Sequence, residues 1–242
     1  MHHQKIKIMG VSFDKVTLDQ AYEKVLEFLG EDKTHIVVTP NSEIVMAAQD
    51  DKELLGILNE ADMVVADGIG VVLASRFYGK PLPERVAGFD LMTKILEKAP
   101  EKGHTIFLLG GKPGIVLKAA EKMKNKYPGL KIAGFHHGYF DALEEKNILK
   151  EINSAEPDFL FVAMGAPKQE KWIYSNKDII NARVCMGVGG SLDVYAGITK
   201  RAPAVFRKLG LEWFYRLIKE PRRIRRMMAL PRFAVRVLFF KE

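Results

Sequence analysis

Short apolar runs alternate with longer amphipathic stretches through residues 1–199 of the chain. This alternation is typical of a mostly parallel sheet whose strands are connected by helices that cover its faces. We therefore expect a Rossmann-like α/β fold for this part of the chain. The predicted strands lie at residues 6–9, 35–38, 62–66, 105–109, 131–135, 158–164 and 183–188.

Helices are predicted between these strands where apolar residues recur on one face. The segment 17–29 begins with Thr17, a good N-cap, and repeats apolar residues with helical spacing. Segments 88–98, 114–127 and 143–153 have similar patterns. No segment repeats at a fixed period, which excludes solenoid folds.

Small polar loops follow five of the predicted strands, and each loop is expected to open a helix. In an open parallel sheet, such loops converge outside the carboxyl ends of the strands, where helix N-termini offer unpaired N–H groups to anions. The sequence therefore predicts a ligand that carries phosphate. The loops lie at residues 39–43, 67–70, 110–114, 165–170 and 189–193.

Two of these loops carry side chains suited to catalysis or binding. Asp67 lies beside Gly68 and Gly70, where the backbone can pass close to a ligand and a carboxylate can act as a base. Thr39 and Asn41 point hydroxyl and amide groups toward the same crevice. The alternative for Asp67 and Asn41 is that each only caps the helix that follows it.

Arg85 and the loop at 165–170 are further candidates for binding. The planar guanidinium of Arg85 is suited to phosphate, although a surface ion pair with Glu84 or Asp90 is the alternative. Lys168 and Gln169 are expected to face the ligand from a helix N-terminus. The alternative is that they form only the solvated start of that helix.

Several motifs that mark cofactor and metal sites are absent from the sequence. The glycines of 110–114 do not have the G-x-G-x-x-G spacing, and no P-loop, H-E-x-x-H, Asp-x-Asp or pair of cysteines occurs. We therefore expect no bound cofactor and no tightly held metal. Cys185 is predicted to be a core residue.

The hydropathy of the chain and its single cysteine bear on its location in the cell. No apolar run is long enough to span a membrane, and the start of the sequence lacks the apolar core of a secretory leader. With one cysteine the chain forms no internal disulfide. We expect a cytoplasmic protein.

The positive charge of the chain is concentrated after residue 200. The net charge of the 242 residues is +7, but residues 200–242 alone carry +10 and residues 1–199 carry −3. The same segment is rich in Trp, Phe, Leu, Ile and Met, and Pro221 and Pro231 should divide it into short helices. We expect a basic amphipathic appendage, at 200–242, separate from the α/β core at 1–199.

Such an appendage can lie in an anionic membrane interface, with its apolar face in the lipid and its arginines on lipid phosphates. The alternatives are a helical hairpin packed on the core or a nucleic-acid patch. Exposed Leu and Phe contribute little to phosphate binding, so we favour a membrane surface and expect no nucleic-acid partner. The exposed apolar residues also favour self-association when no membrane is present.

Six ordered motifs in this chain resemble one known family. They are TPNSEIVMAAQ, ADGIGVV, PERVAGFDLM, FLFVAMGAPKQEKWI, MGVGGSLDVYAG and RAPAVFRKLGLEWFYRLIKEPRRIRRM. In this order they are similar to the WecG/TagA/CpsF glycosyltransferases, from about residue 5 to the end, and the basic appendage favours the TagA branch. The resemblance implies an enzyme at the inner face of the cell membrane, and the missing Asp-x-Asp motif predicts that it works without a metal. It would move N-acetylmannosamine from UDP-N-acetylmannosamine to the 4-hydroxyl of N-acetylglucosaminyl-diphospho-undecaprenol, with inversion, in wall teichoic acid synthesis.

The resemblance also implies roles for particular residues. Asp67, in the ADG motif, would be the catalytic base. Arginines of the appendage would reach the diphosphate and complete the active site. The positions implied to bind substrate are Thr39, Asn41, Arg85, Gln169, Arg216, Arg223 and Arg226.

Three other functions remain open at this point. The donor could carry N-acetylmannosaminuronic acid instead of N-acetylmannosamine. The shape of the pocket decides between these two sugars. The chain could also be a non-enzymatic nucleotide-binding protein that docks on a membrane, which would bind UDP without sugar transfer. A nucleic-acid-binding module would show steep salt dependence on DNA.

Overall fold

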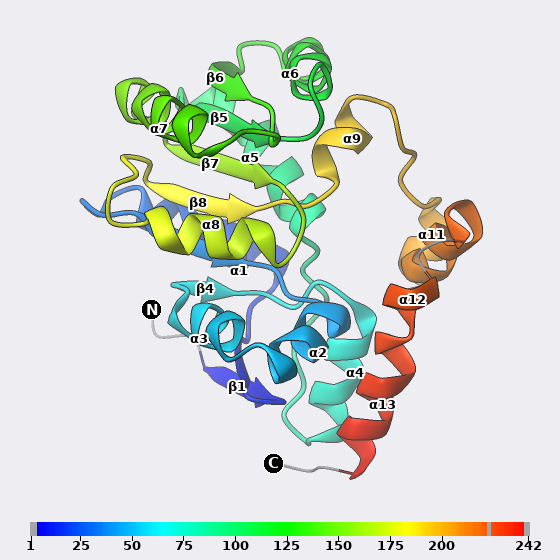
Figure 1. Cartoon of the computed structure of the whole chain (residues 1–242). Helices are drawn as coiled ribbons and strands as arrows, with labels where there is room; N and C mark the ends of the chain where they lie inside the picture. Colours follow the sequence, from blue (N-terminus) through cyan, green and yellow to red (C-terminus); the bar gives the residue numbers. More distant parts are fainter. Residues whose placement is uncertain (1–3, 222–223, 240–242) are drawn as a thin grey trace.

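A computed structural model describes residues 4–221 and 224–239. Its centre is a six-stranded sheet in which every pair of neighbouring strands is parallel (Figure 1). The order β4-β3-β8-β7-β5-β6 places β3, the first strand of this sheet along the chain, next to β8, the last. The strands are β3 (His35–Val38), β4 (Met63–Val64), β5 (Thr105–Gly110), β6 (Lys131–His136), β7 (Phe159–Ala163) and β8 (Val184–Gly187).

Helices cover both faces of this sheet, which gives three layers. Side chains of the central strands alternate between two hydrophobic clusters, as Ile36 and Val37 do in β3. One face is covered by α2 (Ser42–Asp50), α3 (Lys52–Glu60), α4 (Ile69–Phe77), α7 (Ala142–Ala155) and α8 (Lys168–Asn176). The other face is covered by α1 (Leu18–Phe28), α5 (Gly88–Lys102), α6 (Ile115–Lys126) and α9 (Ser191–Tyr195).

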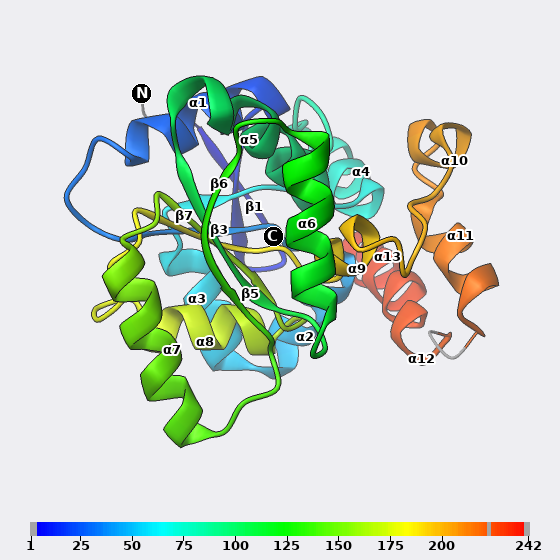
Figure 2. The ribbon, with the colours of Figure 1, turned by 90° about the horizontal axis from the view of Figure 1, so that it is seen from above.

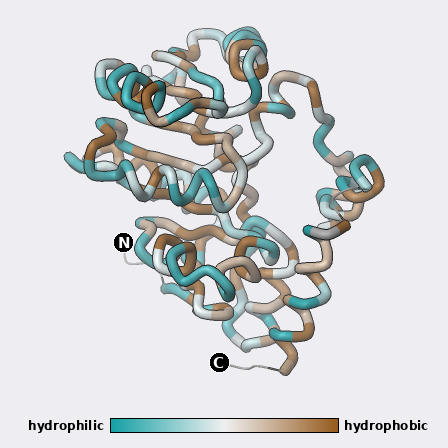
Figure 3. The backbone as a smooth tube through the Cα atoms, viewed as in Figure 1, coloured by the Kyte–Doolittle hydropathy of each residue, from teal (hydrophilic) through white to brown (hydrophobic). Residues whose placement is uncertain are grey.

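The figures show the same layering. In Figure 2, α7 and α6 lie on either side of β5 and β6. Figure 3 shows the outer helices alternating between hydrophilic and hydrophobic residues along their length. This is the amphipathic pattern from which the helices were predicted. The expected α/β class is confirmed.

The first predicted strand does not join the parallel sheet. Instead, β1 (Lys5–Ile8) pairs antiparallel with β2 (Val11–Asp14), a strand that the sequence analysis missed. The two are connected by Met9 and Gly10, both with positive φ, the conformation that a two-residue hairpin turn requires. Buried side chains of this hairpin join the cluster on the α2 face of the sheet.

The four predicted helices are confirmed; α5 and α7 extend further than expected, whereas α1 and α6 are slightly shorter. Thr17 caps α1 and forms a capping box with Gln20. All five polar loops open a helix, namely α2, α4, α6, α8 and α9. The helix α3 was missed, and α5 continues to Lys102 with Pro100 in its last turn.

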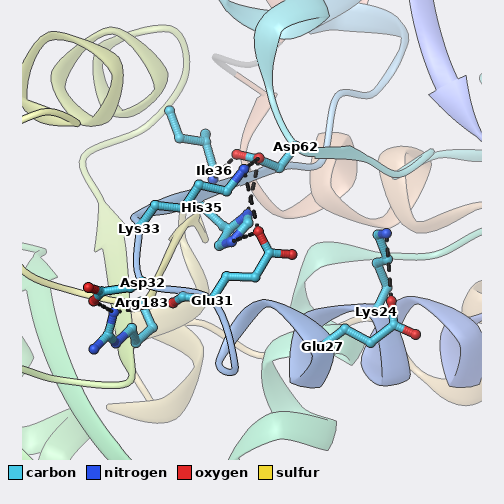
Figure 4. Close-up of polar contacts among 9 residues, drawn as sticks. All are labelled: Lys24, Glu27, Glu31, Asp32, Lys33, His35, Ile36, Asp62 and Arg183. Carbon is cyan, nitrogen blue, oxygen red and sulfur yellow. Dashed lines mark hydrogen bonds and ion pairs between the residues drawn. The ribbon is translucent and has the colours of Figure 1, made fainter. Parts of the chain in front are cut away.

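At the amino end of β3, His35 is buried between two carboxylates (Figure 4). Its Nε2 lies 3.3 Å from Glu31 and its Nδ1 lies 3.0 Å from Asp62, and its ring stacks on Phe28. Asp62 also accepts a hydrogen bond from the backbone N–H of Ile36 at 2.9 Å. These contacts hold the amino end of β3. Its carboxyl end leads into the loop at residues 39–43, the first of the candidate loops.

The appendage is helical, and part of it packs on the core. It forms α10 (Ala204–Lys208), α11 (Glu212–Lys219), α12 (Ile224–Met227) and α13 (Ala229–Phe239). The expected effect of the prolines is confirmed, because α11 ends before Pro221 and Pro231 lies in the first turn of α13. Figure 1 shows this segment, in orange and red, running down one side of the molecule from α9 to α4.

Phe233 and Val237 anchor α13 against α2 and α4, and both are about 5% exposed or less. Other apolar side chains of the appendage face outward. Within the described residues, no helix is both long and apolar enough to cross a membrane. The strongly exposed apolar residues of the appendage include Val205, Leu209, Ile218, Ile224, Met228, Val235 and Leu238.

Candidate active site

A cavity of about 290 Å³ lies at the carboxyl ends of β3, β4 and β8. Loops from the core form its floor, and the appendage closes one side with residues of α11 and α12. Most of the residues singled out in the sequence meet here. The cavity is lined by Thr39, Asn41, Asp67, Arg85, Gln169, Arg216 and Arg226, together with Glu212 and Trp213.

Asn41 and Thr39 follow β3 directly. The capping expected as an alternative for Asn41 is confirmed, because its Oδ1 accepts from the N–H groups of Glu43, at 2.9 Å, and Ile44, at 3.0 Å. Asn41 also lines the cavity, so the same side chain caps α2 and faces the candidate site. Thr39 lies against Gly88, where an added Cβ would come within 2.7 Å of the Thr39 hydroxyl. Glycine is therefore required at this contact.

Asp67 follows β4 and does not cap a helix, so the capping alternative is wrong for this residue. The N-cap of α4 is Gly68, which has a φ of 149°. Oδ2 of Asp67 instead accepts a hydrogen bond from the N–H of Gly88 at 3.1 Å. This contact holds the partly buried carboxylate at the floor of the cavity.

The surroundings of Asp67 make it a stronger base than an exposed aspartate. Burial raises the pKa of its carboxyl above the usual value. The hydrogen bond from Gly88 and the positive charges of Arg85 and Arg216 oppose this effect only in part. The negative charge of Glu212 adds to the increase in pKa. A higher pKa brings a carboxylate closer to the range in which a general base works well.

Arg85 connects the core to the appendage. Its guanidinium pairs with the carboxylate of Glu212 and lies 3.7 Å from Asp90. Arg201, on the connection to the appendage, pairs with Asp90 at 2.7 Å and lies 3.6 Å from Glu212. The expected pair with Asp90 therefore exists, but it is part of a partly buried network. Glu84, the other expected partner, accepts from a backbone N–H of α1.

Gln169 lies in the second position of α8 and is 4% exposed. Its Nε2 donates to Glu170 at 2.8 Å, and its Oε1 accepts from the N–H of Gly189 at 3.0 Å. The prediction that Gln169 faces the cavity is confirmed. The same prediction was wrong for Lys168, whose ammonium points toward the carbonyl of Gly138.

The appendage supplies two of the three arginines that the sequence analysis named. Arg216 lines the cavity, where its charge acts on the carboxylate of Asp67. Arg226 also lines the cavity and pairs with Glu43 at the start of α2. Arg223 lies outside the described residues.

Sequence reasoning missed Glu212 and Arg201. Glu212 is one of the few acidic residues in a strongly basic segment, a signal that could have pointed to it. Arg201 stacks on Phe89, with its guanidinium carbon 4.5 Å from the ring centre. No group of three or more metal-binding side chains gathers within residues 4–221 and 224–239.

Comparison with known proteins places the chain among glycosyltransferases. A family model described as "Glycosyl transferase WecG/TagA/CpsF family" matches residues 6–241. The chain is 41% identical to the N-acetylglucosaminyldiphosphoundecaprenol N-acetyl-beta-D-mannosaminyltransferases of Staphylococcus aureus strains MW2 and NCTC 8325. Each alignment spans 235 residues, which is 96% of this chain and 92% of the relative. The relative of the same name from strain MRSA252 is 40% identical. The chain therefore belongs to the WecG/TagA/CpsF family of glycosyltransferases.

Proposed function

We propose that this chain is an inverting N-acetylmannosaminyltransferase. Its donor is UDP-N-acetylmannosamine, and its acceptor is the 4-hydroxyl of N-acetylglucosaminyl-diphospho-undecaprenol. The staphylococcal relatives support this acceptor and this sugar, because their name states both and their alignments cover 96% of this chain. The observation that carries the proposal is the position of Asp67, a carboxylate of raised pKa in a cavity that arginines line.

In the proposed step, Asp67 takes the proton of the acceptor hydroxyl. The hydroxyl oxygen attacks the anomeric carbon of the donor sugar, and a new carbon–oxygen bond forms. The bond from that carbon to UDP breaks on the opposite face, and its electron pair goes to the diphosphate oxygen. A single displacement inverts the anomeric centre and requires one base, the role assigned to Asp67.

The leaving diphosphate gains negative charge in this step, and cations stabilise it. Arg85, Arg216 and Arg226 line the same cavity as Asp67. Their guanidinium groups can bind phosphate oxygens with two parallel hydrogen bonds. The hydroxyl of Thr39, the amide of Asn41 and the start of α4 can provide neutral donors around them.

The lipid-linked acceptor supports a reaction at a membrane surface. The appendage carries exposed apolar side chains between arginines, which suits the interface of an anionic bilayer. Each basic residue near such a surface contributes about 1 kcal/mol of attraction. We therefore include peripheral binding to the inner face of the cell membrane in the proposal.

Transfer to a short-chain lipid-diphosphate-N-acetylglucosamine analogue tests the proposal. UDP-N-acetylmannosamine should support transfer, and Asp67→Asn should remove at least about 99% of the rate. Asp178→Asn is the matched control, because Asp178 is exposed at the far end of the sheet.

Other outcomes point to other functions. Faster transfer of the uronic acid would overturn the assignment of the donor. Binding of UDP without any transfer would favour a non-enzymatic nucleotide-binding protein. Retention on DNA with no binding to anionic liposomes would overturn the membrane role.

A further inference from the structure

The side chain behind Gln169 is a buried carboxyl that no step above uses. Glu170 is 3% exposed and does not line the cavity, whereas Gln169 does. Its Oε1 accepts the hydrogen bond from Nε2 of Gln169, and its Oε2 has no hydrogen-bond partner among the described residues. Burial raises the pKa of Glu170 above the usual value for glutamate.

A carboxyl in this position is unfavourable for stability alone. Burying an ionisable group with one oxygen unpaired destabilises a fold, and an apolar side chain of similar size would pack here without that loss. The presence of Glu170 therefore requires another explanation. Its one polar contact with a neighbouring side chain is the carboxamide of Gln169.

The contacts of Gln169 define one orientation of its amide. Nε2 faces Glu170, and Oε1 faces the N–H of Gly189. Turning the amide by 180° would place oxygen against the carboxylate oxygen and N–H against N–H, which removes two hydrogen bonds and creates two repulsive contacts. The amide also lies against Gly187, where an added Cβ would come within 2.6 Å of Nε2.

We propose that Glu170 is a positioning residue that fixes the orientation of the Gln169 amide. The fixed amide presents the second hydrogen of Nε2 to an oxygen of the donor substrate. Through Oε1 it also holds the loop after β8 at Gly189. The substrate part of this inference rests on the proposed function, whereas the orientation of the amide does not.

A double-mutant cycle tests the coupling between the two residues. Glu170→Met keeps the length of the side chain and removes the acceptor, so kcat/KM for transfer should fall about tenfold. On the Gln169→Ala background, the same change should cost less than about twofold, because no amide remains to be positioned. Glu170→Gln keeps an acceptor oxygen and should recover most of the loss.

The matched control is Glu151→Gln, an exposed glutamate on α7. Equal losses from Glu170→Met on both backgrounds would overturn the proposal, since they would indicate a structural role only. An unchanged kcat/KM in Glu170→Met would overturn it as well.

A second measurement does not depend on transfer activity. The side-chain amide hydrogens of Gln169, assigned by the signals lost in Gln169→Ala, should exchange at least about tenfold faster with solvent in Glu170→Met than in the wild type. Faster exchange in a chain that transfers no sugar would contradict the proposed function and leave the orienting role supported. Unchanged exchange would overturn the orienting role itself. If Glu170→Met does not fold, Glu170→Leu, which also removes the acceptor, takes its place and should show the same faster exchange, whereas Glu170→Gln should stay near the wild type.

Discussion

The carboxylate of Glu212 in the appendage pairs with the guanidinium of Arg85 in the core, although 127 positions separate them in the sequence. Both residues line the cavity that contains Asp67. Arg201 lies beside the same carboxylate and also pairs with Asp90. The polar part of the contact between core and appendage is thus made by charges that surround the candidate base.

Glu212→Gln should move the pH dependence of transfer toward acid. The negative charge of Glu212 raises the pKa of Asp67, so its removal lowers that pKa. The base then stays deprotonated to lower pH, and the acid limb of kcat/KM shifts downward. Glu97→Gln, at an exposed position on α5, is the control and should leave the limb in place. A shift of the limb toward higher pH would contradict the assignment.

Arg216→Ala should move the same limb in the opposite direction. The positive charge of Arg216 lowers the pKa of Asp67, so its loss raises that pKa. The KM for the UDP-sugar should also rise by about tenfold or more, because a guanidinium contact to phosphate is lost. Rate profiles from pH 4 to 9, measured side by side with Glu212→Gln, give the two directions. Limbs that coincide in the two variants would contradict this account of the Asp67 environment.

Asp67→Asn should inactivate the protein and stabilise its fold at neutral pH. A carboxyl whose pKa is raised by folding favours the protonated state in the folded form. Stability is therefore lost as pH rises from about 4, the value in unfolded chains, through the folded pKa. The variant, which cannot ionise, should have a higher Tm than the wild type at pH 7.5. The difference should shrink at and below pH 4. A lower Tm of the variant at pH 7.5 would show that the carboxylate is net stabilising.

Phe233→Ala should release the last helix from the core. Phe233 is 4% exposed and packs with α13 against α2 and α4, and deleting a buried Phe side chain costs about 3–5 kcal/mol. Limited proteolysis should then cleave the appendage first and leave a core fragment. Phe239→Ala is the matched control, because Phe239 is on the same helix and 77% exposed. Equal protease sensitivity of the two variants would contradict the anchoring role.

A chelator should leave the rate of transfer unchanged. We expect guanidinium groups, with Arg85 and Arg216 at the cavity, to neutralise the departing diphosphate. Initial rates with and without EDTA, followed by addition of Mg²⁺ or Mn²⁺, measure this directly. Loss of the rate in EDTA and its recovery with either ion would show that a cation shares this role.

The sequence was sufficient for the parts of the fold that local patterns define. Buried parallel strands and the polar loops that follow them were predicted, and with them the side of the sheet where Asp67 and Asn41 lie. Hairpin β1–β2 was partly missed because its register depends on a two-residue turn in which Met9 has an uncommon positive φ. The short helix α3 was missed although Leu54, Ile57 and Leu58 have helical spacing and Asp51 caps it, and only Asp51 separates it from the end of α2.

The missed site residues are those whose roles depend on distant partners. Glu212 and Arg201 belong to a segment of high charge, where a solvated surface is the usual expectation. Tertiary contacts of the appendage, such as Gly210 against Ile69 and α13 on α2 and α4, bring that segment to the core beside Arg85. The position of Glu170 behind Gln169 depends in the same way on how α8 meets the end of β8.

The cavity takes its lining from Thr39 through to Leu230. During synthesis, a ribosome must therefore translate almost all of the described chain before the pocket can exist. A nascent or prematurely terminated polypeptide would present the carboxylate at the floor without the guanidinium groups above it. Such a product would hold no complete site for an activated sugar.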